Sequence, residues 1–389
     1  MDYIYQKPLS GSKIGVVFGS FAPLHTGHLD LIMRAKKENN GGCIVVVCGY
    51  DGDKGEPIIP HSKRYRYVRE FFKDDDLVAV YPINDSQLGI ARYPNGWEKW
   101  LEEFSRIYDV AVDKNENHVK RTWYVGDEEY YDGLRERGEE AVLVDRYAKN
   151  KISATNIRTS PLFHWKKIAN TFKRAFSTNV LITGTASEGK STLVQDLGRY
   201  FNASFSYEWA RSYMEENCVS DTELDSADFI AFLYGQHNLN RKMINSPSNN
   251  GFFFADTDSL VTKMYAEYYA KDPNFKMTME EFKIVGDLAD ALTAKSRWDK
   301  IFLLCPHGVF VDDHSRYMAH GGEKERKELF DLLCKSLQQH GLWDKVTILD
   351  GNYYENYLAI KTWVENFRKE DADKFFWFTR VSKGGWNEK

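Results

Sequence analysis

The chain has 389 residues and a net charge of −5. The length suggests two or three domains, and an acidic surface offers no polycationic face for nucleic acid, although local basic sites could still bind small anions. The five cysteines are scattered and show no CxxC spacing, which indicates neither a disulfide framework nor a zinc site. No signal-peptide core is visible, and no apolar run approaches the roughly 20 residues that span a bilayer. We therefore expect a cytoplasmic protein.

Two βα units organise the chain. The first joins the strand-like run 14–18 to a glycine-containing loop and a helix over 29–37, and the second joins 179–183 to another such loop and a helix through about Tyr200. Further strand-like runs lie at 43–48, 77–81, 123–125, 141–144, 204–207, 251–255, 300–305 and 346–349. Strands that alternate with helices predict parallel sheets covered on both faces. We predict two doubly wound α/β domains, over 1–165 and 178–389, with the boundary between about Arg158 and Thr178.

The loop after the first strand reads GSFAPLHTGH and sets two histidines three residues apart at a helix start. Both imidazoles can face one phosphate and stabilise the charge that grows on an α-phosphoryl group, while Gly27 lets the backbone approach closely. A metal site is the rival interpretation, but it lacks a clear third ligand. The predicted catalytic residues are His25 and His28, and the predicted phosphate-binding residues are Gly19, Ser20, Phe21 and Gly27.

A second element of the first domain, ISATNIR, lies far along the chain. Ser153 or Thr155 can cap a helix and hydrogen-bond to phosphate, and Arg158, one turn further on, can hold the outer phosphates. Alone, this pattern is typical of a plain helix N-terminus. Paired with the HxGH loop, it predicts a nucleotide-phosphate site.

The second domain opens with GTASEGKST, which fits the pattern G-x-x-x-x-G-K-[ST] in full. Backbone N–H groups of such a loop surround a phosphate, the ammonium of Lys190 reaches the β- and γ-phosphates, and Ser191 can ligate Mg²⁺. A chance turn is the alternative, but a strand precedes the loop and a helix follows it. The predicted nucleotide-binding residues are Gly184, Thr185, Ala186, Ser187, Glu188, Gly189, Lys190, Ser191 and Thr192.

Carboxylates follow two other strand-like runs of this domain. Asp256 and Asp258 come after 252–255, where a carboxylate can hold Mg²⁺ or a substrate hydroxyl, or can simply cap a helix. Glu208 and Arg211 follow 204–207, where Glu208 can act as a base toward a ribose hydroxyl and Arg211 can pair with substrate phosphate. A surface ion pair is the alternative for the latter two.

The segment DDHSR at 312–316 follows the run 300–305, and a polar, basic stretch comes next. This composition is typical of a lid over transferring phosphates, with Arg316 as a catalytic residue and Asp313 as a substrate-binding residue. A solvated helix start is the alternative.

At these motifs the chain resembles the nucleotidyltransferase superfamily, with its paired HxGH and ISxTxxR elements. From about Lys13 to about Lys361 it resembles, more closely, the NadR-type bifunctional proteins, in which a nicotinamide mononucleotide (NMN) adenylyltransferase is fused to a ribosylnicotinamide kinase. The resemblance rests on the motif order, on the segments YPNGW, GDEEY and YEWAR, and on Asp256-Thr-Asp258.

The resemblance implies that the second domain phosphorylates nicotinamide riboside to NMN with ATP and Mg²⁺. It also implies that the first domain joins NMN to a second ATP, giving NAD and pyrophosphate. Trp97 would stack on nicotinamide or a base, or would be a core or lid tryptophan. Arg64 and Arg66 are further phosphate candidates. Some family members carry an N-terminal helix-turn-helix and repress transcription. Because the first strand begins by about Lys13, we expect no such module here.

Two positions depart from the family pattern. Ala154 stands where glycine is common, and the segment Asp313-His-Ser-Arg316 stands where Asp-Gly-x-Arg is typical. The first departure motivates a second hypothesis, in which the first domain is a weak or inactive adenylyltransferase that senses NAD or ATP and regulates the kinase. A third hypothesis is a nucleotidyltransferase for another phosphate ester, such as phosphopantetheine. A homo-oligomer and functional coupling to a nicotinamide riboside transporter remain open, and no nucleic acid or membrane partner is expected.

Overall fold

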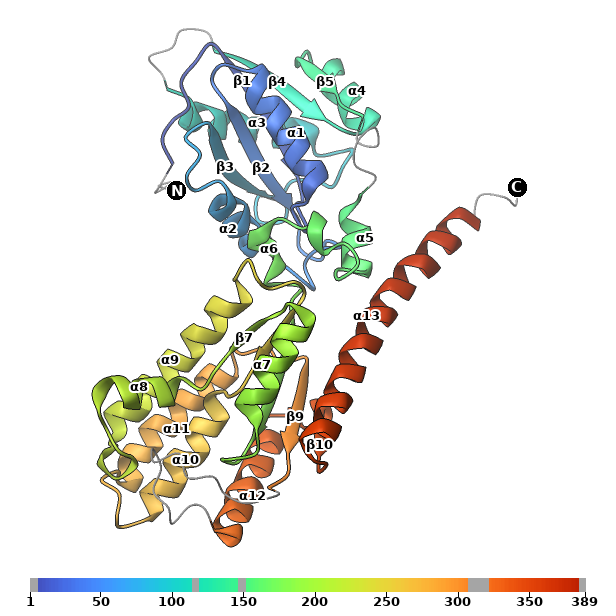
Figure 1. Ribbon diagram of the computed structural model, residues 1–389. Coiled ribbons are helices and arrows are strands. Elements are labelled where there is room, and N and C mark those ends of the chain that lie inside the picture. Colours follow the sequence, from blue (N-terminus) through green and yellow to red (C-terminus); the bar gives the residue numbers. More distant parts are fainter. Residues whose placement is uncertain (1–5, 114–118, 146–151, 307–321, 385–389) are drawn as a thin grey trace. The chain divides into compact units, whose positions relative to one another are not determined.

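The computed structural model describes residues 6–113, 119–145, 152–306 and 322–384 (Figure 1). The chain divides into two compact units, Met1–Phe176 with Asp371–Lys389 and Ser177–Glu370. The division at 176/177 falls within the stretch in which the sequence placed the boundary. Residues 371–389, assigned from the sequence to the second domain, group by contacts with the first unit.

The first unit contains a five-stranded parallel sheet of order β3-β2-β1-β4-β5. Its strands are β1 (Lys13–Gly19), β2 (Cys43–Gly49), β3 (Val78–Asn84), β4 (Lys120–Val125) and β5 (Ala141–Leu143). Its helices are α1 (Thr26–Glu38), α2 (His61–Phe71), α3 (Trp97–Ala111), α4 (Glu128–Glu136), α5 (Ala154–Thr159), the short η1 (Trp165–Lys167) and α6 (Asn170–Lys173). The strand order reverses between β1 and β4, and in such sheets ligands bind outside the carboxyl ends of the strands at that point.

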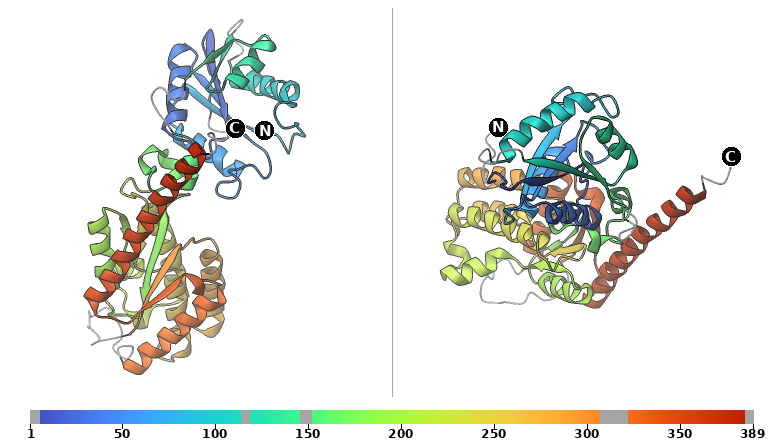
Figure 2. Two further views of the ribbon diagram at one scale, coloured as in Figure 1. Left: turned by 90° about the vertical axis from the view of Figure 1, so that its right-hand side faces the viewer. Right: turned by 90° about the horizontal axis from the view of Figure 1, so that it is seen from above.

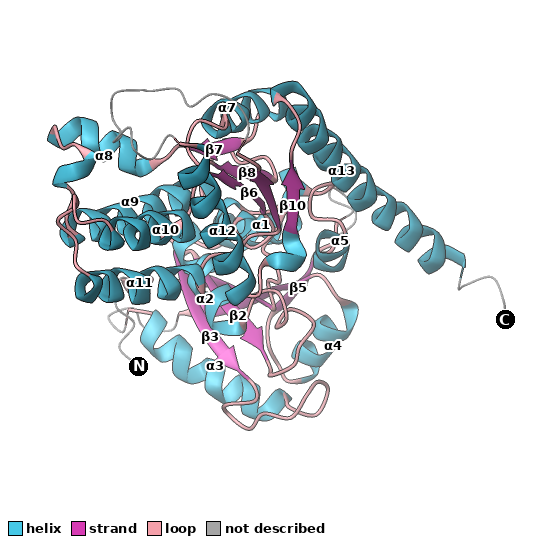
Figure 3. Cartoon of the chain, turned by 90° about the horizontal axis from the view of Figure 1, so that it is seen from below, coloured by secondary structure: helices cyan, strands magenta, loops and turns pink. Residues whose placement is uncertain are grey.

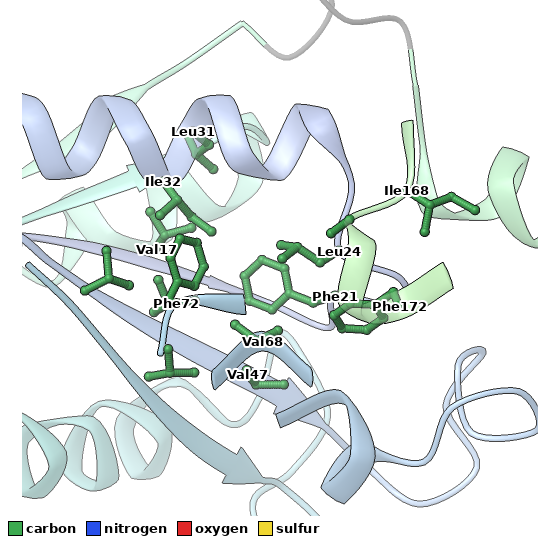
Figure 4. Close-up of a cluster of buried hydrophobic side chains, with 14 of the residues drawn as sticks. Val17, Phe21, Leu24, Leu31, Ile32, Val47, Val68, Phe72, Ile168 and Phe172 are labelled. Carbon is green, nitrogen blue, oxygen red and sulfur yellow. The ribbon is translucent and has the colours of Figure 1, made fainter. Parts of the chain in front are cut away.

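Both faces of this sheet are buried, which explains why its central strands read as continuous apolar runs. Helices α1, α2 and α6 cover one face, and α3 and α4 cover the other. Figure 4 shows Phe21 and Leu24, from the loop after β1, packed near Val68 and Phe172. The functional loop is therefore anchored in the core by its own apolar side chains.

The second unit contains another five-stranded parallel sheet, of order β10-β9-β6-β8-β7 (Figure 3). Its strands are β6 (Thr178–Gly184), β7 (Ser204–Ser206), β8 (Phe252–Ala255), β9 (Lys300–Leu304) and β10 (Val346–Leu349). Its helical segments are α7 (Lys190–Phe201), α8 (Trp209–Asn217), η2 (Asp221–Glu223), α9 (Ser226–Ile244), α10 (Ser259–Lys271), α11 (Met279–Thr293), α12 (Glu323–Gln339), η4 (Trp343–Lys345) and α13 (Tyr353–Gly384). The prediction of two doubly wound parallel-sheet domains is confirmed.

Alternation along β8 divides its phenylalanines between the two faces of the second sheet. Phe253 packs toward α10 and α12, in a cluster with Trp298. Phe252 and Phe254 face the other side, where Phe252 contacts Phe367 of α13 and Phe254 contacts Phe201 at the end of α7. Figure 2 shows the long helix α13, in red, beside the strands of the second sheet. This double burial fixes the register of β8, and with it the position of the residues that follow the strand.

The last described turns of α13 carry residues that pack within the first unit. Asp371 accepts a hydrogen bond from the backbone N–H of Phe163 at 2.9 Å. The ring of Phe375 stacks on Phe163 at 4.8 Å and meets His164 edge-on. Among the described helices, none has the length and apolarity that crossing a membrane requires.

The contact between α8 and α9 supplies the first prediction. The indole of Trp209, the first residue of α8, lies against Gly235 in α9, and a Cβ added at Gly235 would fall 1.9 Å from the indole nitrogen. We expect Gly235→Ala to lower the free energy of unfolding by about 1–3 kcal/mol, because the contact with the indole has no room for a methyl group.

Gly286→Ala is the matched control. Gly286 also lies inside a helix, α11, but its added Cβ would meet only ordinary contacts at 3.6 Å and beyond. Since alanine favours helix over glycine, this variant should be neutral or more stable by up to about 1 kcal/mol. Guanidinium unfolding of both variants decides the matter, and equal stability would contradict the packing described.

Candidate nucleotide sites

The first unit has a cavity of about 480 Å³ at the carboxyl ends of its strands, within the size range of small-molecule sites. The predicted residues that line it are Gly19, Ser20, His25, Gly27, His28, Trp97, Ser153, Thr155 and Arg158. Ala154 lines it as well. The structure therefore brings the HxGH loop and the ISATNIR segment to one cavity.

Two contacts join these segments. The guanidinium of Arg158 donates to the backbone carbonyl of Ala22 at 2.5 Å. Gly27 lies beside Ile152, so closely that an added Cβ would be 3.6 Å from the Ile152 side chain. The oxygen of Ser153 accepts from the N–H of Asn156 and so caps α5. Because of these links, a phosphate held by one segment lies within reach of the other.

The two histidines stack on each other, with ring centroids 3.7 Å apart. His25 is buried, and its Nδ1 accepts a hydrogen bond from the N–H of Gly27. Since Nδ1 is an acceptor, the neutral ring carries its proton on Nε2. That proton is the one His25 can donate to a phosphate oxygen.

Phe21 does not line the cavity with its side chain. Its ring is fully buried in the core and meets the ring of His28 edge-on at 5.0 Å, while its backbone adopts a φ of 45°. A non-glycine residue in this left-handed region is uncommon, and the buried ring holds it there. The structure thus places Phe21 behind His28, where it supports the imidazole from the core.

Arg64 is fully buried and forms an ion pair with Asp53, with 2.6 Å between Nη2 and Oδ2. Its Nη1 donates to the carbonyl of Ser20 at 3.0 Å. Asp53 in turn accepts from the N–H groups of Gly55 and Glu56. Arg64 therefore ties the loop after β2 to the loop after β1. Its neighbour Arg66 is exposed, and neither arginine lines the cavity.

Trp97 begins α3 and is only 8% exposed. Its ring meets Phe18, Tyr93, Trp100 and Tyr130 edge-on. It nevertheless lines the cavity, together with Trp100 and Tyr130. Stacking on a ligand and membership of the core, the two alternatives left open by the sequence, are both compatible with this position.

The cavity contains further polar residues that the sequence analysis missed. Examples are Lys54, Asp85 and Arg92. Lys54 follows β2 and Asp85 follows β3, so the rule that ligands bind beyond the carboxyl ends of parallel strands could have found them. Arg92 lies on a longer loop, with its guanidinium 4.1 Å from the ring centroid of Tyr50, and no local pattern marks it.

The phosphate loop of the second unit runs from β6 into α7. Gly184, Ser187 and Gly189 all have positive φ, which turns the backbone around the loop. The ammonium of Lys190 donates to the carbonyl of Thr185 at 2.7 Å. Among the other predicted loop residues, Thr185 and Ala186 are buried, and Thr192 lies in the first turn of α7.

Glu188 makes a buried ion pair within this loop. Its carboxylate lies 3.0 Å from the guanidinium of Arg326, in the first turns of α12, and both side chains are almost fully buried. The sequence suggested only a phosphate-binding role for Glu188. Its partner lies 138 residues away, so spacing gave no sign of the pair.

The two aspartates after β8 have different surroundings. Asp256 is 1% exposed, and its Oδ2 accepts from the hydroxyl of Ser191 at 2.5 Å. Asp258 caps α10 through Oδ1, while its Oδ2 accepts from the indole N–H of Trp298. Burial raises the pKa of Asp258 to about 6, although the two backbone hydrogen bonds oppose the shift. This placement matches the helix-cap alternative for Asp258.

The second unit has a cavity with a partly polar and partly apolar lining. Glu208, Arg211, Gln236 and Thr257 contribute to its polar lining. Its apolar lining comes from Leu224, Phe229, Phe232, Val261 and Tyr269, among others.

Glu208, which lines this cavity, is held in place by its neighbours. The side chain of Gln236 accepts from the N–H of Trp209 and donates to the carbonyl of Tyr207, one residue to either side. Glu208 stands at the start of α8, but its carboxylate does not cap that helix.

Two predicted residues, Asp313 and Arg316, lie outside the described residues, as does the rest of 307–321. Within the described parts of the chain, no group of three or more histidines, cysteines and carboxylates is placed to hold a metal ion.

Together the two sites define a nucleotide-binding protein with a nucleotidyltransferase-like unit and a P-loop unit. Comparison with family models agrees. Residues 16–160 match the cytidylyltransferase-like family, and residues 179–356 match an AAA domain family.

Whole-chain comparisons extend over both units. The trifunctional NAD biosynthesis/regulator protein NadR of Salmonella typhimurium is 28% identical over 94% of this chain and 86% of its own length. Two crystal structures of NadR, one in complex with NR and one with NAD and AMP-PNP, are each 36% identical with a TM-score of 0.80. They cover 91% and 93% of this chain and 96% and 98% of their own. The chain belongs to the NadR family.

The Arg64–Asp53 pair supplies a prediction. Arg64→Ala would leave a buried carboxylate without its cation, which typically costs about 3–5 kcal/mol. We expect faster hydrogen–deuterium exchange throughout β1 and β2, because the loops that these strands carry lose their tie. Arg66→Ala is the control, since an exposed side chain two residues further along α2 should change stability by less than about 0.5 kcal/mol. Similar exchange in both variants would refute the role given to Arg64.

Proposed function

We propose that this protein is a bifunctional enzyme of NAD salvage. The second unit phosphorylates nicotinamide riboside to NMN with ATP, and the first unit adenylylates NMN to NAD with release of pyrophosphate. The observation that carries the proposal is the meeting of the HxGH loop and the ISATNIR segment at one cavity, in a chain whose second unit holds a complete P-loop and a cavity lined by Glu208 and Arg211. Family membership supports the same pair of activities.

In the kinase step, the 5′-hydroxyl oxygen of the riboside attacks the γ-phosphorus of ATP, and the bond to the β–γ bridging oxygen breaks to release ADP. Glu208 is the proposed base that takes the hydroxyl proton, because it lines the substrate cavity and does not cap its helix. Lys190 and the N–H groups of the loop hold the phosphates, and Arg211 orients the substrate. The apolar side chains of the lining, such as Phe229 and Tyr269, suit a flat ring.

Mg²⁺ fits the residues at the start of α7. The hydroxyl of Ser191 and the carboxylate of Asp256 lie together at 2.5 Å, and both are oxygen ligands of the kind Mg²⁺ prefers. When bound there, the ion would supply positive charge that neutralises the nucleotide phosphates. Asp258 is a cap in this proposal. Arg316 and Asp313, outside the described residues, keep their expected roles toward phosphate and substrate.

In the adenylyl step, a phosphate oxygen of NMN attacks the α-phosphorus of ATP in line, and the bond to the α–β bridging oxygen breaks. His25, through its Nε2 proton, and His28 stabilise the charge on the α-phosphoryl oxygens. Ser153, Thr155 and Arg158 hold the outer phosphates, which leave as pyrophosphate. No covalent intermediate with the protein is part of this scheme.

The proposed location is the cytoplasm, since all five cysteines are free, as is usual in a reducing compartment. A sensing role for the first unit, motivated by Ala154 at the start of α5, is the alternative to adenylyl transfer. The experiment below separates the two, because a sensor would bind NAD or ATP without converting NMN.

Product analysis tests the whole proposal. The pure protein with ATP, Mg²⁺ and nicotinamide riboside should form NMN and then NAD. Lys190→Ala should lower NMN formation by at least about 100-fold while supplied NMN is still converted to NAD, because phosphate-binding cations act mainly on the transition state. His28→Ala should do the reverse.

These two variants serve as controls for each other. Loss of both steps in either folded variant would contradict two independent sites. No NMN and no NAD from the unmodified protein would exclude this pathway altogether, and NMN without NAD would favour the sensing alternative.

The two aspartates after β8 should separate catalysis from stability. We expect Asp256→Asn to lower the kinase rate at least about 100-fold and to raise the Mg²⁺ concentration required, because it weakens an oxygen ligand. Asp258→Ala removes a helix cap and the partner of Trp298, which should cost about 1–3 kcal/mol of stability.

Steady-state kinetics with Mg²⁺ titration and guanidinium unfolding measure the two effects. If Asp258→Ala instead reduced the rate of the fully folded enzyme as strongly as Asp256→Asn, Asp258 would have a direct part in the reaction.

A further inference from the structure

Asp85 occupies a defined place at the carboxyl edge of the first sheet. It directly follows β3, and its backbone N–H donates to the carbonyl of Gly49, at the end of β2, at 2.8 Å. Its own carbonyl accepts from the N–H of Ile90 at 2.8 Å. The side chain lines the 480 Å³ cavity of this unit. Backbone hydrogen bonds on both sides thus hold Asp85 in a fixed position.

The surroundings of Asp85 are mostly apolar and aromatic. Burial and the nearby carboxylate of Asp85 both raise the pKa of the Cys48 thiol, and that thiol also pairs with the side chain of Trp100. Cys48, Trp100, Trp97 and Asp85 all line the cavity. Asp85 therefore shares the lining of the cavity with aromatic side chains on which a flat ring can pack.

One oxygen of this carboxylate lacks a donor. Oδ1 is buried and has no hydrogen-bond partner among the described residues. Burial raises the pKa of Asp85 to about 6. A buried acceptor without a donor costs about 1–3 kcal/mol, so a ligand that brings an N–H group gains by supplying it.

The ring of NMN carries such a group. Its carboxamide has two N–H donors, whereas the carboxylate of the acid analogue, nicotinic acid mononucleotide, has none and bears a negative charge. Opposite Asp85, the ring carboxylate of the acid would place two negative charges at close range. In a site shielded from water, both the repulsion between them and the burial of the second charge are unfavourable.

We propose that Asp85 determines which pyridine mononucleotide the first unit accepts, by accepting a hydrogen bond from the ring carboxamide and repelling a ring carboxylate. This assignment rests on the proposed adenylyltransferase function and adds a residue for its substrate specificity. A site built around a buried polar group rejects analogues that cannot hydrogen-bond to that group. The resulting ratio of kcat/KM values is well above the ratio that an apolar pocket achieves. We expect a preference of at least about 100-fold for the amide.

The test compares the two mononucleotides as substrates and as ligands of the full chain. The unmodified protein should bind NMN at least about 100-fold more tightly than nicotinic acid mononucleotide by calorimetry, a measurement that does not need turnover. Asp85→Asn keeps the size of the side chain, removes its charge and adds an N–H donor. It should reduce the NMN preference in kcat/KM by at least about tenfold, through better use of the acid.

Asp85→Glu, which keeps the charge, should retain the preference. Asp51→Asn is the matched control, because Asp51 is exposed and does not line the cavity. Hydrogen–deuterium exchange of the first sheet in each variant reports that the first unit is folded. Equal binding of the two mononucleotides by the unmodified protein overturns the inference, and so does an Asp85→Asn variant that changes both substrates by the same factor. Absence of NAD formation from NMN in the unmodified protein would instead count against the proposed function, while the binding preference would still test Asp85.

Discussion

The hydrogen bond from the Arg158 guanidinium to the Ala22 carbonyl makes the first site a single structure. Without a link of this kind, the HxGH loop and the ISATNIR segment would be two helix starts more than 120 residues apart, each able to touch a phosphate but with no fixed distance between them. A preorganised site holds its donors where charge develops, and so needs no reorganisation during the reaction. Arg64 adds the same kind of constraint, because its guanidinium donates to the Ser20 carbonyl. Both arginines donate to backbone carbonyls, and each also donates to a side chain: Arg64 to the carboxylate of Asp53, and Arg158 to the hydroxyl of Thr155.

The two units stabilise phosphate charge by different means. In the second unit, positive φ angles at Gly184 and Gly189 turn the loop for the β–γ end of a nucleotide, with an ammonium beside it. In the first unit, the proton of a neutral imidazole is directed by a backbone N–H: because Gly27 donates to Nδ1 of His25, the opposite nitrogen is the donor. A full positive charge suits the dense charge of a triphosphate tail, whereas a directed neutral donor suits an α-phosphorus that a phosphate anion must approach.

The sequence predicted the fold because both sheets are parallel and buried on both faces, which produces apolar runs that need no partner information to identify. The strand β8 and the loop that begins at Gly184 could be predicted from the residues of those segments alone. The sequence also predicted which motif residues share the first cavity, since the carboxyl ends of parallel strands meet at one edge. It could not place Phe21, whose ring turns into the core behind His28 because the backbone at this residue has a left-handed φ. Nor could it pair Glu188 with Arg326, because that contact depends on how α12 packs, far along the chain.

The aspartates illustrate why residue type and strand position do not suffice to assign a role. Asp53, Asp85, Asp256 and Asp258 all follow parallel strands within a few residues, and each has a different set of donors around it. The carboxylate of Asp53 accepts from a guanidinium and two backbone N–H groups. The carboxylate of Asp256 accepts from the hydroxyl of Ser191, an oxygen that can itself ligate a metal ion. The carboxylate of Asp258 accepts from N–H groups at the start of α10 and from an indole. The chemistry of a carboxylate is set by which donors reach it. At Asp85 the buried Oδ1 has no donor among the described residues, and the place of this residue in the cavity lining leaves recognition of a ligand N–H as the interaction that its position can serve.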